Sequence, residues 1–578
     1  MKTLDQALTL HRAGKLSEAE VAYRAVLRAQ PRHADAHALL GVVLEALGRP
    51  QEAVASIKQA MLLDPQAPLF RFYLGNALLS AGDAKGAVQA LRVVIQHQPQ
   101  LAEAHYNLGN ALKLLDDKPG AIAAYRACLA IQPAAHEARN NLALLISAQG
   151  DYAGAYRELQ QVLAAAPDYI QARVNYANIA DEAGDFALSY DQARLAVAQA
   201  PKHTDATFAW GLAAMRQGKA TEALQAYDTL LQLAPNHEKA WDNKAQILEA
   251  QARFPEAGAA YARARVIKPD DADINYHCAL FDLLMGRLTA GFAEYGWRFK
   301  AVPNLKRLQH GSAPVWEGGD PRGKTILVTD EQGFGDSLMF CRFLPILRQR
   351  GARVIYAARP PLLPLLQGWD GVDELPPASA AAQTACDAHC AMMDLPHLLQ
   401  MGEAVPNSAP YLPTPKGDVP NIITSERLRK VGIVWAGNPA HKHDHRRSIP
   451  FATFSMLFGV PGVRFYNLLR QEDLRGDEAQ RFADLGVADL GPYIIDFAAT
   501  ARLVKALDLV ISVDTSTVHL AGALGKPVWV LLPLGPDWRW QTERTDSPWY
   551  PTAKLYRQKT MGDWAEVLLR VREGLMKL

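Results

Sequence analysis

The pattern of apolar and polar residues along the chain changes near residue 300. Before that point, prolines and small residues recur at a fixed spacing, which is typical of helices packed in repeated pairs. After it, short apolar runs rich in β-branched residues are separated by polar or glycine-containing turns and by helical stretches, which indicates strands joined by helices. The pattern therefore predicts an all-α half followed by an α/β half.

The repeat in the first half has a period of 34 residues. It is marked by Pro31, Pro65, Pro99, Pro133, Pro167, Pro201, Pro235 and Pro269. Small residues stand ten and twenty-two residues after each proline, so the two helices of one unit can approach closely. Period and positions match the tetratricopeptide repeat. We predict eight units over residues 1–271, stacked as a superhelix, and a partial ninth unit with a linker over 272–305.

Asparagine recurs within these units. Eight residues after a proline stand Asn107, Asn141, Asn175 and Asn243, and eleven residues after one stand Asn76, Asn110 and Asn178. The two positions are three apart and share a helix face. Two interpretations stay open: asparagine packs locally there, or its amides form a ladder that hydrogen-bonds the backbone of an extended acceptor peptide. The arrangement resembles the asparagine-lined repeats of the O-linked N-acetylglucosamine transferases.

In the second half, a unit near the carboxyl end has the pattern of a ligand site. Two buried strands are predicted at Leu509–Val513 and Val528–Leu532, with a helix over Val518–Leu524 between them. The turn that links the first strand to the helix consists of Asp514, Thr515, Ser516 and Thr517, and His519 follows one turn inside the helix. Such a turn favours phosphate, because free N–H groups gather at a helix amino end. An ordinary capped helix is the alternative.

A similar unit begins the second half. A strand is predicted over Thr325–Thr329, a turn containing Gly333 and Gly335 follows, and a helix over residues 337–350 comes next. The glycines allow a ligand to approach the backbone closely. Asp336 stands at the mouth of this turn, where a carboxylate can cap the helix or act as a general base toward a hydroxyl.

Two further segments contain possible metal ligands. Residues 386–390 hold two cysteines and a histidine, but we favour a loop packed against the first sheet over a zinc site. After a predicted strand over Val431–Trp435 and the turn that ends at Asn438, residues 441–447 alternate histidine with basic residues. A loop in which Lys442 and Arg447 clamp a phosphate is favoured over a metal site, and a solvated charge run stays possible.

Composition narrows the classes of function. The chain has 578 residues, 61 of them basic and 60 acidic, so nothing indicates a nucleic-acid or membrane-surface protein. No window of about 18 apolar residues predicts a membrane span, and the amphipathic amino terminus is not a signal peptide. Five scattered cysteines fit a reduced, cytoplasmic protein without a bound metal.

Two successive Rossmann-like halves, over residues 306–420 and 421–578, match the GT-B layout of glycosyltransferases. This region resembles the ADP-heptose:lipopolysaccharide heptosyltransferases in three motifs: Gly335-Asp336, the segment Arg447 to Pro450, and the segment Asp514 to His519. The resemblance implies that Asp336 is the catalytic base, that Arg447 contacts donor phosphate, and that the turn from Asp514 through His519 holds the nucleotide. The family usually has lysine at the position of Arg447 and often glycine at that of Ser516.

Repeats placed before a GT-B domain are similar to the layout of bacterial flagellin O-glycosyltransferases. The resemblance implies an inverting, metal-independent enzyme with no bound cofactor. It would transfer a nonulosonic acid such as pseudaminic acid, or another sugar, from a CMP-nonulosonate or NDP-sugar donor to Ser or Thr of flagellin. Two alternatives stay open: a heptosyltransferase-like enzyme acting on an envelope glycan or lipid, and a scaffold without catalytic activity.

Overall fold

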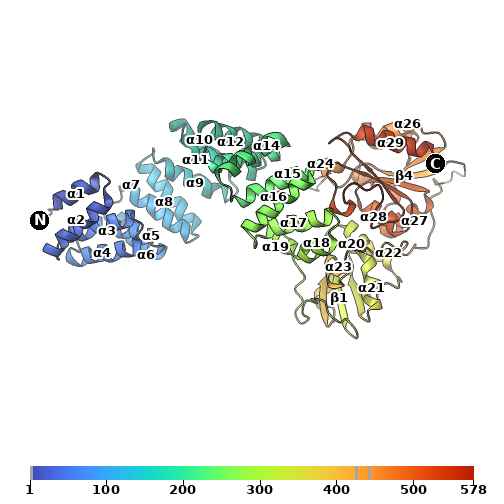
Figure 1. The fold of residues 1–578 in the computed structure, drawn as a ribbon, viewed down its shortest axis with the longest axis horizontal. Helices are drawn as coiled ribbons and strands as arrows, with labels where there is room; N and C mark the ends of the chain where they lie inside the picture. The colour runs from blue at the N-terminus through green and yellow to red at the C-terminus, as the bar shows by residue number, and fades with distance from the viewer. Residues whose placement is uncertain (1–3, 424–426, 440–443) are drawn as a thin grey trace. The chain divides into compact units, whose positions relative to one another are not determined.

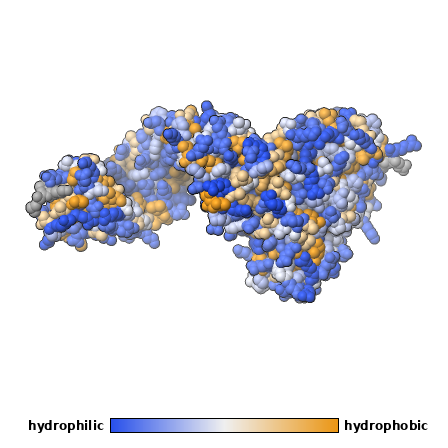
Figure 2. All heavy atoms as spheres, in the orientation of Figure 1, coloured by the Kyte–Doolittle hydropathy of each residue, from blue (hydrophilic) through white to orange (hydrophobic). Residues whose placement is uncertain are grey.

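The computed structural model describes residues 4–423, 427–439 and 444–578. The chain forms two compact units, Met1–Pro235 and Asn236–Leu578. On the face drawn in Figure 2, hydrophilic residues are spread over both units and apolar residues form scattered patches. Among the described residues, no helix combines the length and the apolar character needed to cross a bilayer.

The first unit is built from pairs of helices (Figure 1). The pairs are α1 (Leu4–Arg12) with α2 (Leu16–Ala29), α3 (Ala34–Ala46) with α4 (Pro50–Leu63), α5 (Pro68–Ser80) with α6 (Ala84–His97), α7 (Ala102–Leu114) with α8 (Lys118–Ile131), α9 (His136–Ser147) with α10 (Tyr152–Ala165), α11 (Ile170–Glu182) with α12 (Phe186–Gln199), and α13 (Thr204–Arg216) with α14 (Ala220–Leu233). Each pair follows the predicted 34-residue period. The prediction of tetratricopeptide repeats is confirmed.

Small residues explain why the two helices of a pair pack so closely. The alanines twenty-two residues after the prolines, such as Ala87 and Ala121, are fully buried. At Gly109 an added Cβ would lie 2.5 Å from the Tyr125 ring, so only glycine fits where this ring crosses the first helix. Burial of these apolar faces between neighbouring helices is the main source of stability in such an array.

The turn within most pairs contains a residue in the left-handed conformation. Glycine holds this place in most units, for example Gly48 with φ 75° and Gly82 with φ 83°. Two units depart from this rule, with Asp116 and Ala252 both at φ 58°. Alanine in this conformation is strained, because its Cβ approaches the following carbonyl oxygen.

The second unit begins with the last repeat helices and continues into two parallel sheets. Its repeat helices are α15 (Glu238–Ala250), α16 (Phe254–Ile267), α17 (Ala272–Leu284), α18 (Leu288–Glu294) and α19 (Arg298–Ala301). Their aromatic residues pack on the α/β part: the ring of Phe292 lies 6.0 Å from that of Phe340 and 5.8 Å from that of Trp538. These helices therefore belong to the same compact unit as the sheets.

The first sheet has three parallel strands in the order β2 (Arg353–Ala357), β1 (Thr325–Thr329), β3 (Ala388–Ala391). The expectation of a loop at residues 386–390 was wrong, because β3 occupies most of this segment. All four β3 residues are buried, so the strand shows no alternation of apolar and polar positions. The helix expected over 337–350 is divided into α20 (Phe334–Phe340) and α21 (Leu344–Gln349), because Pro345 cannot continue the first helix.

The second sheet has six parallel strands. Their order is β6 (Ala488–Asp489), β5 (Val463–Asn467), β4 (Arg429–Val434), β7 (Leu509–Val513), β8 (Val528–Leu532) and β9 (Ala553–Arg557). This is the doubly wound order. After β4 the chain adds strands toward one edge of the sheet, and from β7 onward it adds them toward the other edge, so the order of connection reverses between β4 and β7. The main helices around it are α26 (Glu478–Leu485), α27 (Phe497–Ala506), α28 (Ser516–Ala523) and α29 (Trp564–Met576). An α/β domain after the repeats is thus confirmed.

Candidate functional site

The reversal between β4 and β7 brings two predicted turns together. β4 ends at Val434, before the turn that contains Gly437 and Asn438, and β7 ends at Val513, directly before Asp514. In open parallel sheets, ligands bind at the carboxyl ends of the strands that flank such a reversal. This crevice is the candidate donor site. Asn438 is exposed at its edge, and Lys442 lies outside the described residues.

The amino end of α28 forms one side of the crevice. Thr515 is the N-cap residue, but its side chain accepts no capping bond from the helix. Its hydroxyl lies 3.1 Å from that of Ser512 instead. Ser516 and Thr517 are half-buried in the first turn. Because no side chain caps this helix end, its backbone N–H groups can donate hydrogen bonds to a phosphate oxygen.

Arg447 crosses the crevice from the other turn. Its Nη1 donates a hydrogen bond to the carbonyl oxygen of Asp514 at 2.9 Å, and its Nε donates to Asp444 at 3.2 Å. Asp444 also accepts bonds from Ser448 and Arg475, at 2.8 and 2.9 Å. Burial tends to raise the pKa of Asp444, but these donors outweigh it and hold the pKa below its usual value. Asp444 therefore stays ionised and fixes two arginines beside the crevice.

His519 lies beneath the turn rather than in the open crevice. It is buried, and its ring stacks on Trp540 with centroids 5.5 Å apart. Its Nδ1 is 2.9 Å from the Tyr550 hydroxyl, and its Nε2 is 3.7 Å from an Asp514 carboxylate oxygen. Burial tends to raise the pKa of Asp514, but His519 and the charge of Arg539 hold it below its usual value. His519 thus positions Asp514 and supports the turn.

Gly335 brings the two sheets' turns into contact. An added Cβ at this residue would lie 2.7 Å from the His519 ring, which is closer than real side chains approach. Only glycine therefore lets α20, which follows the first strand of the first sheet, pack this tightly on α28 of the second sheet. The motif of the first predicted turn and that of the last one meet at this point.

Asp336 makes both a cap and an ion pair. One carboxylate oxygen accepts the Gly333 N–H at 2.9 Å, which caps α20. The other is paired with Arg539, from the short 3₁₀ helix Trp538–Trp540 of the second half. Burial tends to lower the pKa of Arg539, but Asp336 and Asp537 hold it well above its usual value. Arg539 was not among the predicted site residues. In the sequence, its only mark is that it stands two residues after Asp537, beyond the strand Val528–Leu532.

A buried arginine fills the corresponding crevice of the first sheet. In this sheet β2 is added on one side of β1 and β3 on the other, so the order of connection reverses between β1 and β3. Glu331 follows β1, and Asp394 follows β3. Arg298 of α19 is fully buried and pairs with both carboxylates at 2.7 Å. Burial keeps the pKa of Glu331 above its usual value despite this partner. The last repeat helix is therefore anchored where an open sheet of this kind would bind a ligand.

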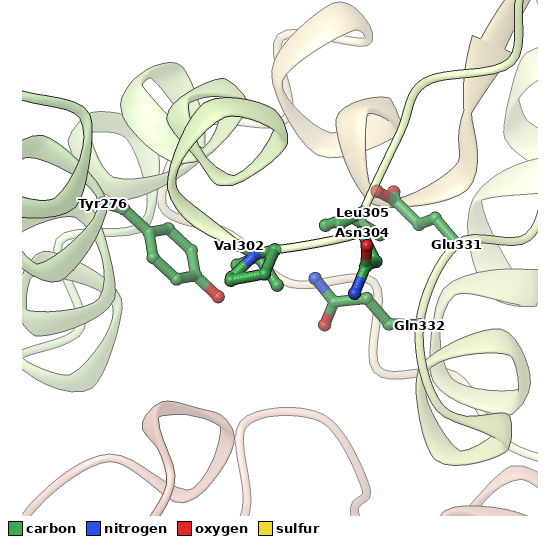
Figure 3. A pocket seen from close by; sticks show the side chains of 7 residues that line it. Tyr276, Val302, Asn304, Leu305, Glu331 and Gln332 are labelled. Carbon is green, nitrogen blue, oxygen red and sulfur yellow. The ribbon is translucent and has the colours of Figure 1, made fainter. Parts of the chain in front are cut away.

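A cavity of about 390 Å³ lies beside this ion cluster (Figure 3). It is lined by Tyr276, Val302, Pro303, Asn304, Leu305, Glu331 and Gln332. In Figure 3 the amides of Asn304 and Gln332 lie next to each other, and the Tyr276 hydroxyl points toward the same space. The amide of Gln332 also donates to the Tyr295 hydroxyl at 3.2 Å.

The asparagines of the repeats bond to one another between adjacent units. Asn107 donates to Asn76 at 2.8 Å, and Asn141 donates to Asn110 at 3.3 Å. Asn175 is buried and donates to Asn140 at 2.9 Å. Asn178 is exposed, and Asn243 is half-buried. The pairing supports a packing role, but each paired amide retains further donor or acceptor capacity for a peptide.

The described residues contain no cluster of three or more histidine, cysteine or acidic side chains arranged to hold a metal ion. His441 and His443 of the basic segment lie outside them. The predicted phosphate ligands of that segment are therefore represented in the structure by Arg447.

Family models described as tetratricopeptide repeat match residues 4–68, 102–134, 147–213 and 208–272, and one described as TPR repeat matches residues 75–116. The helical half thus consists of tetratricopeptide repeats, joined to an α/β domain. The chain is 30% identical to Protein FlbA from Caulobacter vibrioides over 389 residues. The match covers 62% of this chain and 64% of FlbA, so it spans less than two thirds of that relative.

Two solved structures are similar to parts of this chain. MamA is 25% identical, with a TM-score of 0.26 over 28% of this chain and 94% of its own. A tetratricopeptide repeat protein from Parabacteroides merdae is 17% identical, with a TM-score of 0.36 over 43% of this chain and 98% of its own. Both TM-scores are below 0.5, so neither likeness bears on the function.

Proposed function

We propose that this protein is a cytoplasmic O-glycosyltransferase of the GT-B type. It would transfer a sugar from a nucleotide donor to Ser or Thr of a protein acceptor bound by the repeats. The resemblance to flagellin O-glycosyltransferases makes flagellin the proposed acceptor. The proposed donor is CMP-nonulosonate or an NDP-sugar.

One observation carries this proposal: a carboxylate beside the first sheet is paired with an arginine beside the second sheet, close to the turn that begins at Asp514. Asp336 is paired with Arg539, and Arg539 lies near enough to Asp514 to lower the pKa of that carboxyl. Group transfer from a phosphate to a hydroxyl needs a proton acceptor on one side and stabilisation of the departing phosphate on the other. The two sheets supply these groups from separate elements.

The proposed reaction is a single displacement. The acceptor hydroxyl oxygen forms a bond to the anomeric carbon, the bond from that carbon to the donor phosphate oxygen breaks, and Asp336 takes the hydroxyl proton. The nucleotide leaves with the bonding electrons, and its added negative charge is stabilised by Arg447 and the amino end of α28. Attack opposite to the leaving group inverts the anomeric centre.

Arg539 gives this scheme an order. In the structure its guanidinium is paired with the Asp336 carboxylate, so this carboxylate already has a partner before a donor binds. A donor phosphate in the crevice would compete for the same guanidinium, because arginine binds phosphate oxygens in the way it binds carboxylates. We propose that Arg539 turns to the donor phosphate and thereby releases Asp336 to act as the base.

The test is to incubate the purified chain with unmodified flagellin and either CMP-pseudaminic acid or NDP-sugars. Intact-mass spectrometry should detect an added sugar on flagellin. Asp336→Asn should abolish that addition while calorimetry still detects donor binding. Absence of transfer to any acceptor with every donor would favour a scaffold, and sugar found only on a glycan or lipid fraction would replace the protein acceptor.

A further inference from the structure

We infer that the cavity between α17, the segment Val302–Leu305 and the β1–α20 turn is the acceptor subsite. It takes the uncharged peptide segment that flanks the modified hydroxyl. This inference rests on the proposed function and names the part of the acceptor that the catalytic half itself reads.

The position of the cavity supports this assignment. Gln332 in its lining directly precedes Gly333, whose N–H is capped by Asp336 at 2.9 Å. A peptide in the cavity would thus lie against the turn that carries the proposed base. The lining comes from α17, from the segment after α19 and from the β1–α20 turn, and none of the residues that form the donor crevice contributes to it. The cavity is therefore on the acceptor side of the reaction.

The chemistry of the lining suits a neutral peptide. Asn304 and Gln332 present primary amides and Tyr276 presents a hydroxyl, all of which can bond peptide N–H and C=O groups. Val302, with its neighbours Pro303 and Leu305, supplies an apolar wall. Glu331 is the ionisable carboxylate in the lining, and Arg298 pairs with it at 2.7 Å. The lining thus offers neither the cations that a phosphate needs nor an unpaired charge for a basic peptide.

The repeats connect to this cavity through α17. Tyr276 precedes His277, which stands eight residues after Pro269, at the position that asparagine holds in several earlier units. Gln246 of the preceding unit lies 3.4 Å from the His277 ring nitrogen. The asparagines Asn107 and Asn76 are linked in the same way between adjacent units. Within the second compact unit, a polar link of this kind therefore stands beside the residue that lines the cavity.

The experiment measures steady-state kinetics of transfer to unmodified flagellin. Asn304→Gly removes an amide while keeping a residue suited to φ 64°, and Gln332→Ala and Tyr276→Phe each remove one polar group. Each change should raise KM for flagellin between about two- and tenfold, as expected for one lost hydrogen bond. Val302→Trp, which fills the cavity, should raise it further. The donor affinity and kcat at saturating flagellin should stay unchanged, and Lys306→Ala, just outside the lining, should have no effect.

Two outcomes separate this inference from the proposed function. If the wild-type chain transfers sugar but all four cavity variants keep the wild-type KM for flagellin, or lose donor affinity instead, the cavity assignment is wrong and the function stands. If no transfer occurs, calorimetry with unmodified flagellin replaces kinetics. Weaker flagellin binding by Val302→Trp, with Lys306→Ala unchanged, would then support the subsite although the proposed reaction is wrong.

Discussion

Replacing Arg298 with methionine should destabilise the second unit in a way that depends on pH. Methionine keeps much of the apolar stem of the side chain but removes the guanidinium, which is fully buried between Glu331 and Asp394. Asp394 retains a partner, because Arg307 lies 3.0 Å away. Glu331 retains the Met393 N–H at 3.1 Å but loses its counter-charge. The variant therefore creates one buried carboxylate without a cation.

The size of the effect follows from the proton that Glu331 must take up. A buried carboxylate without a counter-charge becomes protonated rather than stay ionised. At pH 7, protonating a carboxyl whose ordinary pKa is about 4.3 costs about 3.5 kcal/mol, since one pKa unit equals about 1.36 kcal/mol. This agrees with the loss of about 3–5 kcal/mol expected when a buried ion pair is broken. At pH 5 the same protonation costs only about 1 kcal/mol. Because the pKa is raised in the folded state, stability is lost as pH rises.

Differential scanning calorimetry of the full chain at pH 5 and pH 7 tests this reasoning. For a unit of this size, Tm should fall by about 5 °C at pH 7 and by about 1–2 °C at pH 5. Combining Arg298→Met with Glu331→Gln removes the titrating carboxyl. The decrease in Tm of this double variant relative to wild type should therefore be the same at both pH values. If Arg298→Met and wild type have the same Tm at pH 7, the reasoning is refuted. If the Tm of Arg298→Met falls equally at pH 5 and pH 7, the effect is due to packing.

Three further predictions concern single residues. Arg539→Gln should weaken donor binding by tenfold or more in calorimetry, because a charge-assisted bond to phosphate contributes about 1.5–3 kcal/mol; unchanged affinity would place Arg539 outside the donor site. Gly335→Ala should lower the free energy of unfolding by about 1–3 kcal/mol through its clash with His519, whereas Gly296→Ala, which has open space for a Cβ, should be neutral in the same thermal melt. Ala252→Gly should raise the free energy of unfolding by about 0.5–1 kcal/mol by relieving the left-handed strain; a lower Tm would contradict this.

The sequence predicted the architecture well where a local pattern determines it. The 34-residue period fixes helix pairs, because every unit repeats the same close contact, such as that of Gly109 with Tyr125. Strands followed by polar turns, as at Leu509–Val513, were also recognisable from local residues. The strand β3 was not, because it is short and buried on both faces. β9 and α26 were also missed, since neither stands beside a turn motif that would mark it.

The candidate site could be predicted only in part for a related reason. Asp336 and Arg447 stand in motifs next to strand ends, so their places were predictable from neighbouring residues. Arg539 meets Asp336 across 203 residues of sequence, and Arg475 meets Asp444 across 31. Such pairs arise from the way the two sheets and their turns fold together, and no local spacing specifies them. The buried position of His519 was equally unpredictable, since it depends on Trp540 and Tyr550, which come from a distant loop.

The place of Arg298 has a consequence for how many nucleotides one chain can hold. Two parallel sheets offer two crevices at strand reversals, and either could in principle accept a mononucleotide. In the first sheet, the guanidinium of Arg298 already stands between the two carboxylates that follow β1 and β3. A titration should therefore saturate at one nucleotide per chain. The crevice that related folds use for a ligand has here become the socket that joins the last repeat helix to the α/β domain.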